Sequence, residues 1–213
     1  MNINYENNNI AHLRGEVINE PIYSHEILGE GFYDLKIKVP RLSDQFDIIP
    51  VTISERLLGE TTIGETLSID GQFRSYNKLE DGKSKLILTL FAKELVDDEP
   101  STNSNTITLT GYICKEPIYR TTPFGREICD CLLAVNRAYN KSDYIPCIAW
   151  GRNARFVKNL EIGSKVTIIG RIQSREYQKK YSEERIETKT AYEVSISSIG
   201  ITNNDDTEDS IIE

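Results

Sequence analysis

The sequence predicts an all-β protein that consists of two tandem copies of one small barrel. Two observations carry this prediction: the first half of the chain recurs in the second half, and apolar and polar residues alternate with period two along much of the chain. The residues that recur 96 positions later are Gly15, Pro21, Ile22, Tyr23, Ile49 and Pro50, and those that recur 99 positions later are Ile63, Gly64 and Gly71. One duplication with a three-residue insertion explains both offsets.

The second copy gives the clearer strand pattern. Its expected strands cover residues 106–113, a segment around 131–135, and residues 144–150, 165–177 and 192–199. A short helix is expected over residues 152–160, between the third and fourth strands. Five strands with one helix after the third form the layout of an OB-fold barrel. Gly163 and Gly170 are expected to supply a turn and the sharp bend that closes the barrel.

The duplication divides the chain into four parts. Residues 1–96 contain the first OB-fold copy and residues 105–200 the second. Residues 97–104 are polar and include a proline, which is typical of a linker. Residues 201–213 are too polar and acidic to pack, which predicts a disordered acidic C-terminal tail.

Composition favours a soluble cytoplasmic protein without metal or cofactor. The longest apolar stretch, Leu86 to Ala92, is far too short to span a bilayer, and the Asn-rich start has no secretory pattern. The four cysteines form no CxxC pair, and both histidines lie in the other half of the chain. A zinc site needs clustered ligands, so we expect buried, reduced thiols.

Charge is distributed unevenly along the chain. The formal net charge is −8, yet residues 105–200 hold 15 Lys and Arg against 10 Asp and Glu. Residues 1–104 hold 10 against 18, and residues 201–213 hold none against 5. A basic second barrel is thus flanked by acidic segments. Because phosphate affinity depends on local cations, the acidic total does not exclude nucleic acid.

The strand over residues 144–150 predicts a face that stacks on bases. Its small and medium apolar residues share one side, so Tyr144, Ile148 and Trp150 point to the other side, outward from the barrel. Exposed rings on a strand suit single-stranded nucleic acid, because every base has a π-face. The alternative is that these rings cover a dimer or inter-domain contact.

Basic and aromatic residues also interleave further along the second copy. The candidates on the fourth strand and the hairpin after it are Arg171, Arg175, Tyr177, Lys179, Lys180 and Tyr181. Those on the loop after the second strand are Arg137 and Tyr139, and Arg152 begins the expected helix. Rings for bases beside cations for phosphates are what a groove that follows a single strand requires.

The second copy resembles the bacterial single-stranded DNA-binding proteins over nearly its whole length. The strings that carry the resemblance are Leu133-Ala-Val-Asn-Arg137, Tyr144-Ile-Pro-Cys-Ile-Ala-Trp150 and Lys165-Val-Thr-Ile-Ile-Gly-Arg-Ile-Gln-Ser-Arg175 with Tyr177. The resemblance implies that Tyr144, Trp150 and Tyr177 stack on bases. It also implies a protein that coats and protects single-stranded DNA in replication, recombination and repair, with two OB folds per chain and a homodimeric assembly.

The tail resembles the acidic, apolar-tipped end through which this family recruits other replication and repair proteins. The residues that carry this likeness are Asp205, Asp206, Asp209, Ile211 and Ile212. The tail departs from the family motif, because Glu213 follows and no Pro-Phe pair is present.

The first copy lacks the rings of the second. Ser54 stands where Trp150 stands, Ile48 matches Tyr144, and Lys78 matches Tyr177. We therefore expect a degenerate barrel that serves assembly or a protein partner.

Catalysis is not expected. The strand of Trp150 offers no pair of outward carboxylates for metal-assisted hydrolysis, and the sequence has no phosphate-binding GxxxxGK[ST] loop. The alternative functions are an OB-fold adaptor that binds proteins and a single-stranded RNA binder, because stacking does not sense the 2′-OH.

Overall fold

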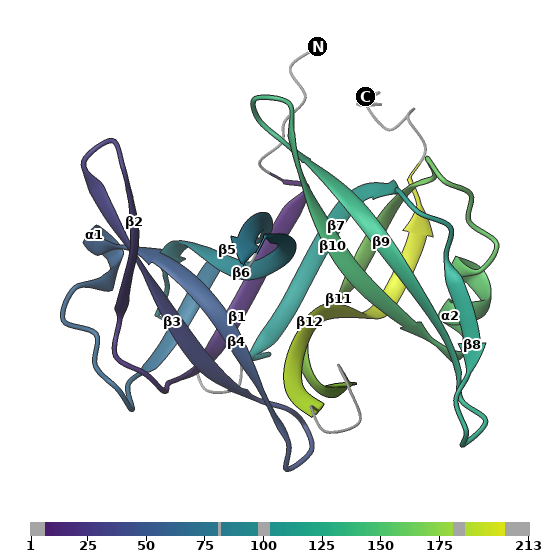
Figure 1. Cartoon of the computed structure of the whole chain (residues 1–213), viewed down its shortest axis with the longest axis horizontal. Helices are drawn as coiled ribbons and strands as arrows, with labels where there is room; N and C mark the ends of the chain where they lie inside the picture. Colours follow the sequence, from purple (N-terminus) through teal and green to yellow (C-terminus); the bar gives the residue numbers. More distant parts are fainter. Residues whose placement is uncertain (1–6, 81, 98–102, 181–185, 203–213) are drawn as a thin grey trace, which may run out of the picture.

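The computed structural model describes residues 7–80, 82–97, 103–180 and 186–202. Figure 1 shows two β-barrels side by side, the first coloured purple to blue and the second teal to yellow. The elements of barrel 1 are β1 (Asn9–Val17), β2 (Ile22–Ile27), β3 (Glu30–Pro40), β4 (Phe46–Ser54), α1 (Glu55–Leu58), β5 (Thr66–Glu80) and β6 (Lys83–Leu95). Those of barrel 2 are β7 (Asn105–Ile113), β8 (Ile118–Thr121), β9 (Glu127–Arg137), β10 (Lys141–Trp150), α2 (Gly151–Val157), β11 (Lys165–Lys180) and β12 (Ile186–Ile201).

The described strands form one continuous hydrogen-bonded sheet. Its order is β2-β3-β4-β6-β5-β1-β7-β11-β12-β10-β9-β8, and the additional pairings β3–β1 and β7–β9 close the two barrels. The halves join through antiparallel β1 and β7, where Ala11 lies opposite Ile107. These two residues are 96 positions apart, like the repeated glycines and prolines. The barrels are therefore related by an approximate twofold axis through this pair.

The period-two pattern of the sequence builds the core of each barrel. Along β1 and β7, alternate side chains are buried, and Leu13 and Leu109 are completely inaccessible to solvent. Ile49 on β4 and Ile145 on β10 are buried in the same way. The predicted all-β fold is confirmed, because alternation places one face of each strand inside a barrel.

Two glycines allow the strands to bend at equivalent places. A Cβ added at Gly71 or Gly170 would lie 2.3 Å from the carbonyl oxygen of Phe91 or Ser195, respectively. The strand register also shifts at both glycines. Only a residue without a side chain permits this close approach, as the sequence predicted for Gly170.

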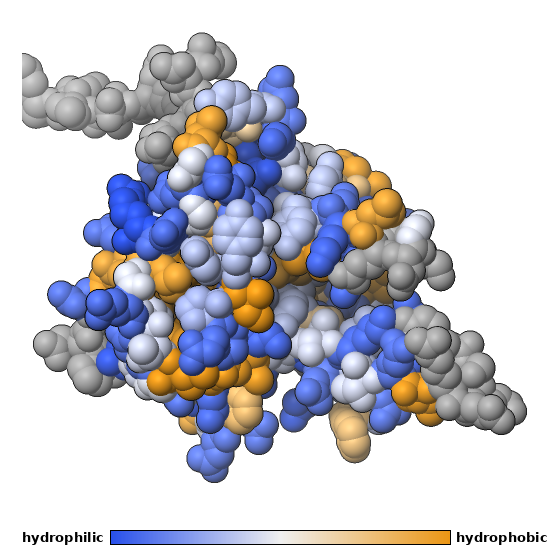
Figure 2. Space-filling model, turned by 60° about the vertical axis from the view of Figure 1, so that its left-hand side comes forward, coloured by the Kyte–Doolittle hydropathy of each residue, from blue (hydrophilic) through white to orange (hydrophobic). Residues whose placement is uncertain are grey.

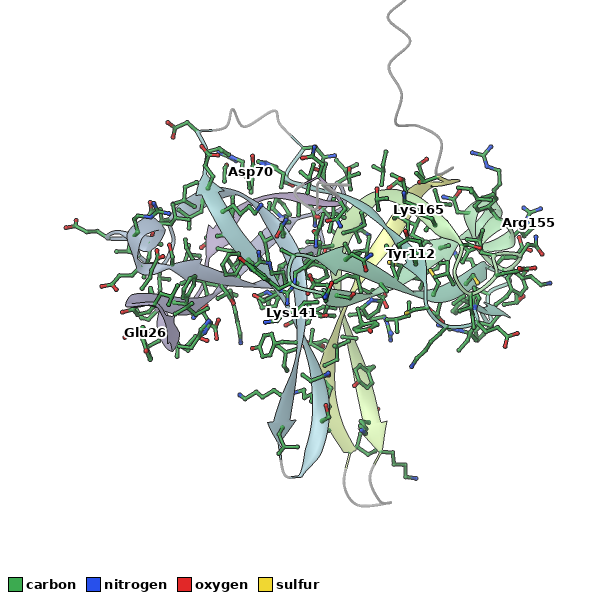
Figure 3. All side chains as sticks on the ribbon, turned by 90° about the horizontal axis from the view of Figure 1, so that it is seen from above. Glu26, Asp70, Tyr112, Lys141, Arg155 and Lys165 are labelled. Atoms are coloured by element: carbon green, nitrogen blue, oxygen red, sulfur yellow. The ribbon has the colours of Figure 1, made fainter. Side chains whose placement is uncertain are left out.

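The structure adds elements that the sequence pattern did not reveal. The short strands β2 and β8 each form a hairpin with the next strand, and α2 ends at Val157 instead of residue 160. The long β5–β6 and β11–β12 hairpins extend beyond the barrels and project from the same side of the molecule (Figure 3). In the described part of the chain, neither helix is long enough to cross a bilayer.

Candidate nucleic-acid interface

The outer face of barrel 2 presents two aromatic rings from β10. Tyr144 is 45% exposed and Trp150 39%, and the side chains between them on the opposite parity are buried. Ile148 was expected to point outward with them, but it is only 4% exposed. It lies at the middle of the sheet face, with Asp130 of β9 on one side and Ser195 of β12 on the other, so neighbouring strands flank it.

The β11–β12 hairpin adds a ring and a cation beside this face. Arg175 lies 6.0 Å from the centroid of the Tyr177 ring, and its Nε lies 3.6 Å from Oε1 of Glu193. Lys179 and Lys180 follow at the end of β11. Tyr181, the remaining candidate of this hairpin, lies outside the described residues, as do the tail candidates.

Two further candidates lie at opposite ends of β10. Tyr139 is 94% exposed at the β9–β10 turn, where it and Asn140 both have positive φ, 60° and 55°. Arg152 is exposed in the first turn of α2, two residues after Trp150. The two residues thus flank the β10 face instead of lying on it.

Arg137 and Arg171 do not point freely to solvent as phosphate contacts would. Nε of Arg137 lies 3.5 Å from Oδ2 of Asp143, and Nη1 of Arg171 lies 3.2 Å from Oδ2 of Asp47. Both carboxylates are fully buried. Each of these two predicted phosphate contacts therefore forms an ion pair with a buried carboxylate at the junction of the barrels.

Comparison with known proteins shows what barrel 2 resembles. Residues 104–201 match the model of the Single-strand binding protein family. This part of the chain is therefore similar to that family, and we call it the family domain. The match covers β7 to β12, which is all of barrel 2.

Curated relatives match over a similar stretch. The chain is 40% identical over 81 residues to Single-stranded DNA-binding protein 1 of Staphylococcus aureus, which covers 35% of this chain and 48% of the relative. It is 35% identical over 86 residues to Single-stranded DNA-binding protein A of Bacillus subtilis, which covers 37% and 50%. The chain thus spans about half the length of these relatives.

A solved structure matches both barrels. The wild-type single-stranded DNA binding protein from Thermus aquaticus superposes with a TM-score of 0.73 at 19% identity, covering 94% of this chain and 96% of that chain. A deletion mutant of the same Thermus protein gives a TM-score of 0.69 at 21% identity. The tandem OB fold therefore extends over barrel 1 as well as the family domain.

Two polar contacts, which we call clasps, connect the family domain to barrel 1. In the Asp47 clasp, the backbone N–H of Ser174 donates to Oδ1 of Asp47 at 2.7 Å, and Ser174 Oγ accepts from the N–H of Ile48 at 3.1 Å. In the Asp143 clasp, the N–H of Ser75 donates to Oδ1 of Asp143 at 2.7 Å, and Ser75 Oγ accepts from the N–H of Tyr144 at 2.7 Å.

The clasps occupy positions related by the duplication. Asp47 and Asp143 are 96 residues apart, and the two serines are 99 apart. One clasp joins β4 to β11 and the other joins β10 to β5, so each barrel supplies one carboxylate and one serine. Because the Asp143 clasp includes the backbone of Tyr144, it also fixes the strand that carries the stacking rings.

The two carboxylates differ in their cationic partners. Asp47 faces both Arg171 and Arg41, whose Nε donates to it at 2.8 Å, and this hydrogen bond raises the pKa of Arg41. Asp143 faces Arg137, and its Oδ2 accepts no hydrogen bond from the described residues. Burial raises the pKa of Asp143, against the opposing effects of the Ser75 N–H and the charges of Arg137 and Arg74.

The raised pKa of Asp143 predicts a pH-dependent stability. Since the folded-state pKa lies above the unfolded value, the ionised carboxylate destabilises the folded state, and protonation removes this penalty. As pH falls from about 7 to about 4, the free energy of unfolding of the wild-type chain should therefore rise relative to that of Asp143→Asn. Urea unfolding at a series of pH values measures this difference.

The control for that measurement is Asp130→Asn, which alters a surface carboxylate paired with Arg120. As pH falls, the wild type should gain stability relative to Asp143→Asn, whereas it should not gain stability relative to Asp130→Asn. A wild-type chain that loses stability relative to Asp143→Asn in acid would mean that attraction to Arg137 outweighs burial.

The sequence reasoning missed the β8–β9 hairpin. Arg120 lies opposite Ile128, and Ile128 lies opposite Trp150, so one row across three strands carries a cation and the ring. At the tip of this hairpin, Phe124 is almost completely exposed, and Arg126 follows two residues later. The signal was present, since one aromatic residue stands between two arginines in this short segment.

The corresponding face of barrel 1 is arranged differently. Ser54, which matches Trp150, is buried, and Ile48 is part of the Asp47 clasp. The Phe91 ring on this face is covered by the guanidinium of Arg74, 3.8 Å from its centroid. Barrel 1 thus presents no rings at the positions that match Tyr144 and Trp150.

Proposed function

We propose that this chain is a sequence-independent single-stranded DNA-binding protein that coats and protects exposed strands in replication, recombination and repair. The observation that carries the proposal is the set of exposed rings, Tyr144, Trp150 and Tyr177, on one side of the family domain. Bases stack on these rings, and nearby cations such as Arg175 and Arg152 neutralise phosphates. Counterion release then contributes to affinity, which falls with added salt.

We infer a division of labour between the parts of the chain. Residues 105–200 bind the strand, and residues 1–96 hold that domain in place through the clasps, with residues 97–104 as the linker. The acidic tail, residues 201–213, recruits replication or repair proteins. The protein acts as a cytoplasmic homodimer and performs no catalysis.

The homodimer proposal rests on the family and on the exposed apolar side chains that the barrels retain. Ile10 on β1, Ile169 on β11 and Ile201 on β12 are each about half exposed or more, on strands at the centre of the sheet. On the face drawn in Figure 2, hydrophobic side chains form small separate patches among hydrophilic ones.

Single-stranded DNA should quench the emission of Trp150, the one tryptophan in the sequence, because a stacked base lies against its ring. Trp150→Ala should weaken binding of oligo-dT by about 1–3 kcal/mol. Fluorescence titration with wild-type protein and anisotropy of labelled oligo-dT with the variant measure these effects. Parallel titrations with oligo-rU and duplex DNA test the preference for single-stranded DNA.

The matched control is Phe156→Ala. Phe156 lies on α2 and is 38% exposed, almost the same as Trp150, but it is not on the β10 face. The Phe156→Ala variant should bind oligo-dT with the same affinity as the wild type. Tight binding with unchanged Trp150 emission, together with normal affinity of Trp150→Ala, would remove this face from the site.

A further inference from the structure

A groove of about 1530 Å³ lies between the barrels, on the side where the β3–β4 hairpin of barrel 1 approaches β11. We call it the inter-barrel groove. Its lining comes from β1, the β3–β4 hairpin and the start of β5 in barrel 1, from the start of β7 and the two residues before it, and from β11 and β12 of barrel 2. The lining residues that matter here are Arg14, Lys38, Phe46, Arg171 and Ser197. The sequence pattern singled out Arg171 but none of the three residues that barrel 1 contributes, Arg14, Lys38 and Phe46.

Barrel 1 supplies an exposed ring and two cations to this groove. Phe46 is 48% exposed, and the ammonium of Lys38 lies 4.7 Å from the centroid of its ring. Arg14 lines the same groove from β1 and forms no ion pair with any residue in the described ranges. An exposed ring beside cations is the combination that binds a base and its phosphates.

The acidic residues of the groove restrict what else could occupy it. Glu16 and Asp44 also line it, and Asp47 neutralises much of Arg41 and Arg171. The remaining positive charge is small, so a highly charged anion alone would gain little. A ligand that contributes an aromatic face as well as phosphates fits better, because it gains contact energy from Phe46.

The groove is continuous with the face that carries Trp150. Ile148 on β10 pairs with Ser195 on β12, which pairs with Arg171 on β11, and Arg171 lines the groove. Asn153, three residues after Trp150, donates from Nδ2 to the carbonyl oxygen of Ser197, which also lines the groove. A strand that stacks on Trp150 therefore reaches the groove along one continuous surface.

We propose that the inter-barrel groove binds the next stretch of the same single-stranded DNA, with a base against Phe46 and phosphates beside Lys38 and Arg14. This inference rests on the proposed function of barrel 2. It gives barrel 1 a direct role in binding through residues that do not match Tyr144, Trp150 or Tyr177. The β3–β4 hairpin of one barrel thereby extends the site of the other.

A relocated tryptophan tests the groove directly. In the full-length chain, Phe46→Trp combined with Trp150→Phe leaves position 46 as the one indole, since the sequence has a single tryptophan. Oligo-dT of about 30 nucleotides should quench this indole, whereas oligo-dT of about 6 nucleotides should quench it far less. An OB fold binds about 4–16 nucleotides, so the short oligo fits on one barrel and the long oligo extends beyond it.

A charge pair on β3 provides the matched variants. In the wild-type background, Lys38→Gln should lower the affinity for the long oligo about tenfold and reduce its salt slope by about 0.7, the value for one single-strand phosphate contact. Lys36→Gln removes the same charge two residues away, from an exposed position outside the lining, and should change neither. Neither variant should alter affinity for the short oligo.

The outcomes separate this inference from the proposed function. If the long oligo binds wild type and quenches Trp150, but the indole at position 46 is unchanged and Lys38→Gln behaves like Lys36→Gln, the groove is not part of the site. If oligo-dT does not bind wild type at all, the proposed function itself is wrong. Quenching at position 46, together with weaker binding of the long oligo by Lys38→Gln than by Lys36→Gln, supports the groove.

Discussion

Replacing Asp47 with alanine should destabilise the whole chain by about 3 kcal/mol. The substitution removes the buried acceptor of the Ser174 N–H and leaves Arg41 and Arg171 facing each other without a carboxylate. Breaking a buried ion pair by deleting one partner costs about 3–5 kcal/mol, and the lower end applies because both guanidiniums still reach solvent. Urea unfolding followed by far-UV circular dichroism measures the change in the free energy of unfolding.

The matched control is Asp44→Ala in the same β3–β4 hairpin. Asp44 is exposed and takes part in neither clasp, so its loss should change the free energy of unfolding by less than about 0.5 kcal/mol. Equal stabilities of Asp47→Ala and Asp44→Ala would show that the Asp47 clasp does not stabilise the junction of the barrels.

Removing all three rings of the family domain should abolish most of the binding. The chain with Tyr144→Ala, Trp150→Ala and Tyr177→Ala loses three stacking contacts, each about 1–3 kcal/mol. A total of about 5 kcal/mol corresponds to a loss of roughly 10³–10⁴-fold in affinity for oligo-dT. The residual binding should come from phosphate contacts and should disappear steeply with salt. Anisotropy titrations at two salt concentrations measure both effects.

A double variant elsewhere controls for the loss of exposed aromatic surface. Tyr23→Ala with Phe156→Ala removes exposed rings from β2 and α2, away from the β10 face. Its affinity should remain within a factor of about three of wild type, a change below about 1 kcal/mol. If the triple variant keeps the affinity of the wild type while this double variant binds oligo-dT more weakly, the strand binds on another surface.

Most of the barrel architecture could be predicted from local sequence patterns. The offsets of 96 and 99 identified the duplication. Gly71 and Gly170 recur at such an offset because both positions must lack a side chain, where β6 and β12 approach closely. Parity along β10 placed Tyr144 and Trp150 on the outer face, because a strand alternates its side chains whatever surrounds it. The same rule was wrong for Ile148, because burial on an outer face depends on the neighbouring strands.

The sequence by itself therefore determined the duplication, the OB-fold layout and the outward rings. The duplication follows from residues that recur at fixed offsets, and the layout and the rings follow from the alternation of neighbouring residues. Only the tertiary structure decided what Arg137 and Arg171 contact. Asp47 and Ser174 lie 127 positions apart and meet because β1 and β7 pair antiparallel and turn the two barrels about a common axis. The sequence of a cation-rich strand is the same whether its arginine faces a phosphate or a buried carboxylate. The pairing of β9 with β10 decided the contact of Arg137, and the docking of the barrels decided that of Arg171.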